Sequence, residues 1–359
     1  MKTKLVYVLT CAPEKNYIEQ ALMSVYSARH WNPDVHIVLI VDNLTDDLLV
    51  GKHAEILNYI SEKIVVPFDD DSLTMKYRSR FIKTSVRRLV HGRLMFVDSD
   101  TIVCGDLSEI DTFDCEIGAV WESHLLPKDY CQPLFEKDQD RTMRLGVDLD
   151  EEKVYFSSGV VLAEDSDLAQ QLFQLWHDTW LEATKLDMNI DQPSLAKANK
   201  LLGHVIQRIP DVYNCIVFTQ NNFIRQAKIL HISSYRNPSY LFTNRVLKYV
   251  EDNGLKNQWL IDSILNPCAS ILPFDNDILH SDSKQRREWI KEIARFSRGY
   301  GDTIDASFAD FPMQSRFRSI VVGLMRKKFN GLAARIWMLW KRVYVWRHRK
   351  TIKDNVCRK

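Results

Sequence analysis

The chain has 359 residues with 45% hydrophobic composition, which is ample for a large core and fits one large domain with appendages or two domains. Its seven cysteines are scattered and form no Cys-x-x-Cys, so neither a disulfide framework nor a zinc site is expected. No run of about 18 apolar residues marks a membrane span, and the apolar stretch near the N-terminus ends too early for a typical secretion signal. We therefore expect a cytoplasmic protein.

Charge is distributed unevenly along the chain. The formal net charge is only +1. Residues 312–359 carry 14 Lys and Arg and a single acidic residue, Asp354, which leaves residues 1–311 with 34 basic and 46 acidic side chains. An acidic body with a strongly basic tail predicts a polyanionic surface as the partner of the tail.

The first hundred residues alternate between short apolar runs and segments with helical periodicity. Strands are predicted at residues 5–9, 36–41, 63–66 and 94–97. Helices are predicted between them at residues 18–30, 46–59 and 76–89, the second with Thr45 as its N-cap. This alternation predicts an α/β fold, in which a Rossmann-like, mainly parallel sheet carries helices on both faces.

The next part of the chain is less regular. Further strands are predicted at residues 117–121, 154–162, 204–209 and 228–231, with a Ser-Ser-Gly break inside the second of them. Helices are predicted at residues 167–184 and from Asp191 to about Lys200. The polar segment from His124 to Asp150 is predicted to be an irregular loop or lid.

Two carboxylates follow the apolar run at residues 94–97. In extended chain, residues two apart point to the same side, so Asp98 and Asp100 can converge on one point. Two oxygen ligands at the carboxyl end of a strand suit Mn²⁺ or Mg²⁺. The same Asp-x-Asp pattern recurs in five places that follow no such run, and there we interpret it as a solvated turn or helix cap: Asp69-Asp71, Asp138-Asp140, Asp148-Asp150, Asp165-Asp167 and Asp275-Asp277.

Glycine-rich phosphate loops are absent from the sequence. Neither Gly-x-Gly-x-x-Gly nor Gly-x(4)-Gly-Lys-Ser/Thr occurs among the 12 glycines. If the fold binds a nucleotide, a metal ion would therefore have to balance the phosphate charge, which is consistent with Asp98 and Asp100.

The order of the motifs carries a resemblance to a known family. A first strand and Asn-Tyr turn are followed by an Arg-bearing helix, Asp-x-Asp, a Tyr-Phe-x-x-Gly-Val strand, Asp-Gln, Tyr-Asn and a strand ending in His. Over residues 4–236 this order resembles the family-8 retaining glycosyltransferases, which include bacterial lipopolysaccharide galactosyl- and glucosyltransferases and glycogenin. The resemblance implies a GT-A fold, a UDP-hexose donor and Mn²⁺ (or Mg²⁺).

The resemblance also implies roles for individual residues. Asp98, Asp100 and His231 would ligate the metal, while Asp191 and Gln192 would lie near the anomeric carbon of the donor sugar. The remaining donor contacts would come from Asn16 and Tyr17 at the uridine, Arg80 at the phosphates or sugar, Ser157 and Ser158 at the sugar, and Tyr213 and Asn214 nearby. Arg78 or Lys83 could take the place of Arg80, because one extra residue lies between Arg80 and Asp98.

The sequence departs from the family pattern at a few positions. Ser157 stands where the family usually has Asn, and Ser234 stands where Gly usually follows the metal-binding His. The Lys expected just after is absent, and Arg236 is the candidate replacement. These departures bear on the identity of the donor sugar more than on the fold.

Retention of anomeric configuration requires either a covalent intermediate or attack by the acceptor on the face from which UDP leaves. A double displacement needs a nucleophile beneath the sugar, typically a carboxylate. Gln192 is a poor nucleophile and Asp191 is only a candidate, so we favour same-face attack.

The basic tail has the pattern of an interfacial helix. Cations alternate with Trp, Tyr and aliphatic residues, and four cations spaced seven apart would share one stripe of a helix: Lys328, Arg335, Arg342 and Arg349. Such a segment is typical of helices that lie in a membrane interface, where anionic lipid contributes about 1 kcal/mol for each nearby cation. A helix packed on its own domain is the alternative, and nucleic acid is a weaker one because no recognition motif accompanies the charge.

Together these features predict three parts. Residues 1–240 form a nucleotide-sugar-binding catalytic domain, residues 241–311 a helical extension, and residues 312–359 a basic amphipathic tail at the inner face of a membrane. The predicted function is transfer of glucose or galactose from a UDP-sugar to a glycan or lipid-linked acceptor in lipopolysaccharide or other surface polysaccharide synthesis. Two alternatives stay open: a catalytically inactive membrane-bound scaffold, and a sugar-phosphate nucleotidyltransferase, which would need a glycine-rich loop that residues 10–17 lack.

Overall fold

The structure is a computed structural model that describes residues 1–70, 72–129, 132–216, 226–232, 240–242 and 244–267. The predicted tail at residues 312–359, the predicted donor contact Arg236 and the part of the predicted helical extension beyond residue 267 lie outside the described residues. Among the described residues, no helix combines the length and apolar character needed to cross a bilayer.

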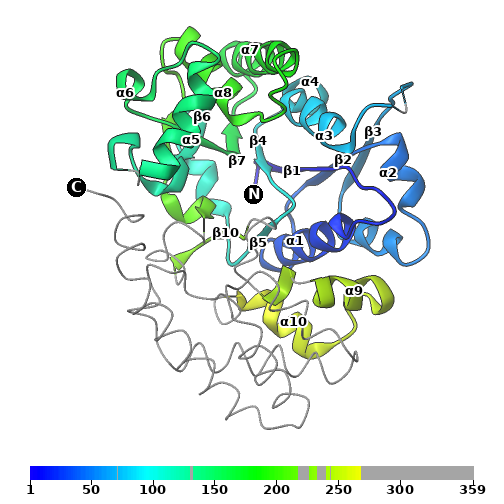
Figure 1. Cartoon of the computed structure of the whole chain (residues 1–359). Helices are drawn as coiled ribbons and strands as arrows, with labels where there is room; N and C mark the ends of the chain where they lie inside the picture. The colour runs from blue at the N-terminus through cyan, green and yellow to red at the C-terminus, as the bar shows by residue number, and fades with distance from the viewer. Residues whose placement is uncertain (71, 130–131, 217–225, 233–239, 243, 268–359) are drawn as a thin grey trace, which may run out of the picture.

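A seven-stranded sheet forms the centre of the molecule (Figure 1). Its order is β3-β2-β1-β4-β7-β6-β8, and every neighbouring pair is parallel except the two pairs that contain β7. The strands are β1 (Lys4–Leu9), β2 (Ile37–Asp42), β3 (Glu62–Val66), β4 (Leu94–Val97), β6 (Ile117–Trp121), β7 (Phe156–Ala163) and β8 (Gln207–Arg208). The predicted mainly parallel sheet is therefore confirmed.

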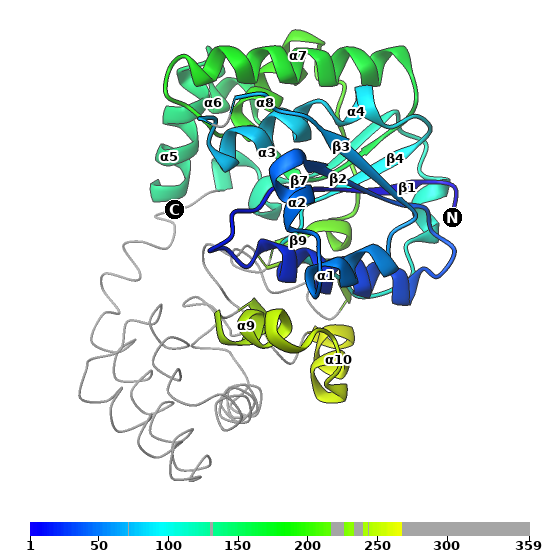
Figure 2. The same ribbon diagram turned by 90° about the vertical axis from the view of Figure 1, so that its right-hand side faces the viewer.

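Helices cover both faces of this sheet (Figure 2). Alternate residues of β1 enter different cores: Leu5, Tyr7 and Leu9 pack into one cluster, and Val6 and Val8 into the other. The first cluster lies against α1 (Tyr17–Trp31), α9 (Asn244–Asn253) and α10 (Gln258–Leu265). The second lies against α3 (Met75–Thr84), α4 (Val86–Leu89), α7 (Asp167–Thr184) and α8 (Gln192–Leu201). Burial on both faces explains why the inner strands β1, β2 and β4 are nearly continuous apolar runs.

A second, three-stranded sheet adjoins the end of β4. Its order is β5-β10-β9, formed by β5 (Thr101–Val103), β10 (Ile229–His231) and β9 (Cys215–Ile216). β10 runs antiparallel to β5, with His231 opposite Thr101. This pairing brings the end of a late strand beside the turn that contains Asp98 and Asp100.

The predicted helix at residues 46–59 is wrong in its start and its continuity. Helix α2 spans Asn43–Leu48, and its N-cap is Asp42, whose carboxylate accepts the backbone N–H of Thr45. The Thr45 hydroxyl accepts the N–H of Cys11 instead. Gly51 then adopts a φ of 57°, which ends the helical path, and a 3₁₀ helix (His53–Asn58) follows.

The predicted irregular loop from His124 to Asp150 is largely helical. After two short 3₁₀ turns (Glu122–His124 and Pro127–Asp129), the chain forms α5 (Gln132–Met143) and α6 (Leu149–Glu152). The side chain of Gln139 joins the two helices, because it donates to Asp148 Oδ1 at 2.8 Å and accepts from the N–H of Leu149 at 2.8 Å. The polar composition of this segment gave little sign of helices, because its buried apolar cluster is small and is formed by Val147, Leu149 and Tyr155.

Two predicted strands also differ in detail. β7 runs without interruption through Ser157, Ser158 and Gly159, all of which are buried, so the predicted break does not occur. The predicted strand at residues 204–209 shortens to Gln207–Arg208, followed by a 3₁₀ turn (Asp211–Asn214). Two more 3₁₀ turns, at Ser108–Thr112 and Tyr240–Phe242, complete the described elements.

Candidate metal and sugar-donor site

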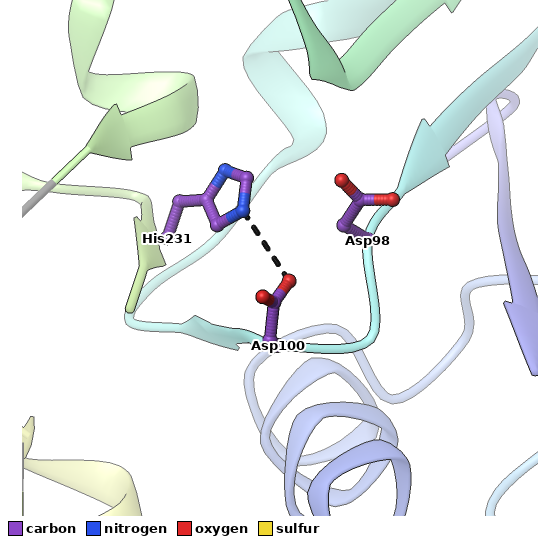
Figure 3. Close-up of side chains that lie close together, drawn as sticks. All are labelled: Asp98, Asp100 and His231. Atoms are coloured by element: carbon purple, nitrogen blue, oxygen red, sulfur yellow. Dashed lines mark ion pairs between the residues drawn. The ribbon is translucent and has the colours of Figure 1, made fainter. Parts of the chain in front are cut away.

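Asp98 and Asp100 lie in the tight turn between β4 and β5. The turn is fixed by backbone contacts: Asp98 N donates to Gly159 O at 2.8 Å, and Ile232 N donates to Asp100 O at 3.0 Å. The Thr101 hydroxyl donates to Asp98 O at 2.8 Å. Both carboxylates therefore point into the space beyond the carboxyl end of β4 (Figure 3).

His231 completes a group of three potential metal ligands. Its Nε2 lies 3.3 Å from Asp100 Oδ1, and one ligand atom from each of Asp98, Asp100 and His231 lies within 4.8 Å of the others. Its Nδ1 lies 3.0 Å from Asn214 Oδ1, an amide oxygen that can only accept, so Nδ1 carries the proton and Nε2 faces the carboxylates. Two hard oxygens and one oriented imidazole fit a divalent cation such as Mn²⁺.

Gly159 makes room for this group. A Cβ atom built at Gly159 would lie 2.3 Å from His231 Cε1 and 3.1 Å from Asp98 Oδ2. Real Cβ atoms essentially never approach other atoms to under 3.0 Å. The imidazole thus packs directly on the backbone of β7, which only glycine permits here.

A second group of charges adjoins the first. Lys83 Nζ is 3.1 Å from Asp98 Oδ1 and 3.1 Å from Asp191 Oδ2, and it also lies 3.4 Å from the Ser158 hydroxyl. Arg80 Nε lies 2.9 Å from the other oxygen of Asp191. Lys83 and Asp191 are both almost fully buried. The buried lysine therefore joins the carboxylates of Asp98 and Asp191 into one site.

The cationic side chains of helix α3 contact different parts of the molecule. Arg80 and Lys83 are three residues apart and share the helix face that points to Asp191. Arg78 lies apart from them and forms a buried ion pair with Asp42 at the end of β2. Of the three cations that the sequence offered for the donor phosphates, the structure thus brings Arg80 and Lys83 to the site and gives Arg78 a structural contact.

The surroundings shift the pKa values of the three acidic and basic groups at the centre. Burial raises the pKa of Asp98, and the Lys83 ammonium opposes this only in part. Burial acts in the same direction on Asp191, but Lys83 and Arg80 outweigh it and hold the pKa of Asp191 below its ordinary value. Burial alone would lower the pKa of His231, but Asp100 and Asp98 outweigh it and raise that pKa. Asp191 is consequently held ionised at neutral pH.

The other predicted donor contacts are distributed around the same edge of the sheet. Ser157 accepts a hydrogen bond from Asn214 Nδ2 at 3.2 Å, so it supports the residue that orients His231. Asn16 and Tyr17 lie at the start of α1, after β1, which is parallel to and paired with β4. Parallel neighbours end at the same edge of a sheet, so this turn and the Asp98 turn open on one side of the molecule.

Tyr213 does not reach the centre of the site. It is buried, and its hydroxyl donates to Glu109 Oε2 at 2.8 Å.

Gln192 has a partner that the sequence reasoning missed. Its Nε2 donates to Glu122 Oε2 at 3.1 Å. Glu122 follows strand β6 as a lone acidic residue without a motif, so no sequence pattern distinguished it. Lys83, by contrast, was among the cations that the sequence offered, and its i,i+3 spacing to Arg80 places the two side chains on one face of α3.

A group of three potential cation ligands beside a buried Lys–Asp pair lies at the carboxyl end of a mainly parallel sheet, which is where open α/β sheets bind their ligands. The sequence agrees: residues 8–235 match the family described as Glycosyl transferase family 8. The chain belongs to this family of glycosyltransferases. The membership confirms the resemblance and, with the observed sheet, the predicted GT-A class of fold.

Several solved structures are similar at a distance. Mouse xyloside xylosyltransferase 1 in its apo form has 15% identity and a TM-score of 0.43, covering 64% of this chain and 97% of that one. The glycosyltransferase GlyE of Streptococcus pneumoniae has 18% identity and a TM-score of 0.44, covering 76% and 66%. The galactosyltransferase LgtC, in complex with donor and acceptor sugar analogues, has 13% identity and a TM-score of 0.45, covering 76% and 97%.

Similarities this distant carry no conclusion about donor or acceptor. No curated protein matches the chain.

Proposed function

We propose that this protein is a metal-assisted retaining hexosyltransferase that moves glucose or galactose from a UDP-sugar to a glycan or lipid-linked acceptor. The observation that supports this most is the convergence of Asp98, Asp100 and His231 next to the Lys83–Asp191 pair. In a family-8 chain, potential cation ligands next to buried polar and charged side chains suit a nucleoside diphosphate sugar.

The three ligands would hold Mn²⁺ or Mg²⁺, which when bound would supply Lewis-acid stabilisation of the departing diphosphate. Arg80 adds a positive charge that is one third exposed at the same place. Ser158 and Asp191 would contact the hydroxyls of the donor sugar, and Asn16 and Tyr17 would bind the uridine. These residues bind and orient the donor so that its anomeric carbon faces the acceptor.

The ion pairs of the Asp191 carboxylate bear on how the anomeric configuration of the sugar would be retained. Both of its carboxylate oxygens are engaged, one by Lys83 at 3.1 Å and one by Arg80 at 2.9 Å. A carboxylate neutralised by two cations is a weak nucleophile, so a covalent glycosyl–Asp191 intermediate is disfavoured. This supports attack by the acceptor hydroxyl on the face from which UDP departs.

The acceptor side of the proposal comes from the sequence. The net charge of the tail, with 14 basic residues and one acidic residue in 312–359, suits the anionic inner face of a membrane. We place the enzyme there, acting on lipid-linked precursors of lipopolysaccharide or another surface polysaccharide. Removing residues 312–359 should release the protein from vesicles containing anionic phospholipid, and unchanged binding would refute the assignment.

The first experiment is calorimetric titration of UDP into the protein with Mn²⁺ and again with EDTA. Metal-dependent binding, with slow hydrolysis of UDP-glucose or UDP-galactose, is expected. Asp100→Asn should abolish both, and full activity of that variant would overturn the metal assignment. No binding of UDP under either condition would favour the inactive scaffold, whereas turnover of a sugar phosphate with a nucleoside triphosphate would favour the nucleotidyltransferase.

A further inference from the structure

We propose that Glu122 is a positioning residue that fixes the orientation of the Gln192 side-chain amide toward the donor sugar. The contact between them has only one chemically reasonable form. Glu122 Oε2 lies 3.1 Å from Gln192 Nε2, and a carboxylate accepts hydrogen bonds but donates none. The NH₂ group must therefore face Glu122, and the carbonyl oxygen must face the other way.

Glu122 is itself held rigidly. Its second carboxylate oxygen accepts a hydrogen bond from the Ser123 hydroxyl at 3.3 Å, and its backbone N–H donates to Tyr155 O at 2.8 Å. The preceding residue, Trp121, carries the Arg208 guanidinium 3.6 Å above its ring. Glu122 is therefore held through its side chain, its backbone and the residue before it.

The turn that follows Glu122 is strained. Ser123 and His124 both have a φ of 58°, in the left-handed region that residues with a Cβ atom rarely adopt. A residue in this conformation is strained, and the conformation persists only where the surroundings enforce it. Here they do, since both residues are buried and His124 Nε2 accepts the N–H of Ile216 at 2.8 Å. A relaxed turn would move the Glu122 carboxylate away from Gln192.

The oriented amide adjoins the proposed donor site. Gln192 is the first residue of α8 and follows Asp191, whose carboxylate contacts Lys83 and through it Asp98. In the described part of the chain, the carbonyl oxygen of Gln192 receives no hydrogen bond. When the bond to UDP breaks, positive charge develops on the sugar ring and its anomeric carbon. A fixed carbonyl oxygen stabilises that charge, whereas a reversed amide would present its N–H groups and destabilise it.

This assignment rests on the proposed sugar transfer and deepens it, so its test must separate the two. The kinetic arm compares Glu122→Ala, Gln192→Ala and the double variant in Mn²⁺-dependent turnover of the UDP-hexose that the wild type accepts. Glu122→Ala should lower kcat about tenfold to hundredfold while the donor KM and the UDP Kd change less than about twofold. In the Gln192→Ala background the same change should have almost no further effect, because Glu122 acts only through Gln192.

Two further variants sharpen the comparison. Glu122→Gln keeps an acceptor oxygen but no longer dictates which end of the Gln192 amide faces it, so an intermediate kcat is expected. Glu116→Gln is the matched control: it removes a carboxylate at the opposite end of β6, where Glu116 accepts a hydrogen bond from Ser166, and should leave kcat unchanged. Wild-type kcat in Glu122→Ala, or losses that add fully in the double variant, would overturn the assignment.

A spectroscopic arm follows the contact independently of turnover. The side-chain amide signal of Gln192, identified by its loss in Gln192→Ala, should show a hydrogen-bonded shift and slow exchange in the wild type. Glu122→Ala should move it to the position of a free amide, and a free-amide signal in the wild type would overturn the contact. If the wild type turned over no UDP-hexose, the proposed function would be overturned instead, and with it the catalytic role of the Glu122–Gln192 contact.

Discussion

Replacing Gly159 with alanine tests the geometry of the metal site with a single methyl group. The added Cβ would meet His231 Cε1 at 2.3 Å and His231 Nδ1 at 2.7 Å, against an ordinary contact distance of at least 3.4 Å. The imidazole would therefore have to recede by about 1 Å, since the backbone of the fully buried strand β7 cannot. Its Nδ1 would also lose the 3.0 Å contact with Asn214 that fixes the ring.

The expected effect on metal binding is large. Metal–ligand distances tolerate deviations of about 0.2 Å, so a displacement of about 1 Å removes His231 from the ligand set or leaves it badly placed. Loss of an orienting contact alone typically lowers metal affinity about tenfold to hundredfold, and we expect Gly159→Ala to lower Mn²⁺-dependent UDP affinity by at least that factor. Crowding of the core should also lower the free energy of unfolding by about 1–3 kcal/mol.

The assay is calorimetry of UDP binding with Mn²⁺, together with urea unfolding in EDTA. Gly105→Ala is the matched control: Gly105 follows β5 in the same small sheet, and its added Cβ would meet only Lys228 Cδ at 3.6 Å and Nζ at 3.8 Å. That variant should bind UDP like the wild type. Wild-type Mn²⁺-dependent binding by Gly159→Ala would show that His231 is not held against β7 as described, and the metal assignment would fall with it.

Two further predictions concern charges. Lys83→Met leaves the carboxylates of Asp98 and Asp191 without their shared cation, so the free energy of unfolding in urea should fall by about 3 kcal/mol, and a loss below about 0.5 kcal/mol would contradict the buried pairing. Hydrogen bonds from Thr3 and the N–H of Lys2 outweigh burial and lower the pKa of Asp111. Its contribution is therefore present above the unfolded-state pKa of about 4 and lost as pH falls through the lower folded-state pKa. Asp111→Asn should destabilise the protein by about 1–2 kcal/mol at pH 7 and progressively less in acid, and a pH-independent loss would contradict this reasoning.

Much of the fold could be predicted because its signals are local. The strand at residues 94–97 and the helix at residues 167–184 coincide with β4 and α7, since a buried strand and an amphipathic helix each impose a period on the sequence. The errors arose where a single side-chain hydrogen bond, and not a periodic pattern, decides where an element begins or whether it forms. Asp42 caps α2 from the end of β2, and Gln139 joins α5 to α6, and neither contact leaves a periodic trace.

The residues of the candidate site also fall into two groups, those that a local sequence pattern predicted and those that it did not. Asp98 and Asp100 stood out because a buried strand precedes them, whereas Asp148 of another Asp-x-Asp pattern caps α6 and Asp165 accepts the N–H of Gly92. Glu122 and Gly159 escaped notice, because their importance lies in contacts across 70 residues or more, with Gln192 and with His231. No sequence pattern distinguishes this glutamate from the other acidic residues of the chain, or this glycine from the other glycines.

What makes Asp98 and Asp100 a site is the register of the small sheet. His231 is paired with Thr101 across β10 and β5, so its side chain lies beside Asp100, and the bond from Ile232 N to Asp100 O secures the same register. Successive residues of a strand point to opposite faces, so a slip of one residue would place Ile232 or Leu230 beside the carboxylates and turn the imidazole away. The pairing of residues 101–103 with residues 229–231 therefore decides which side chain of β10 lies beside Asp98 and Asp100. Substitutions in β10 that leave all three ligands intact but weaken this pairing should then impair metal-dependent UDP binding.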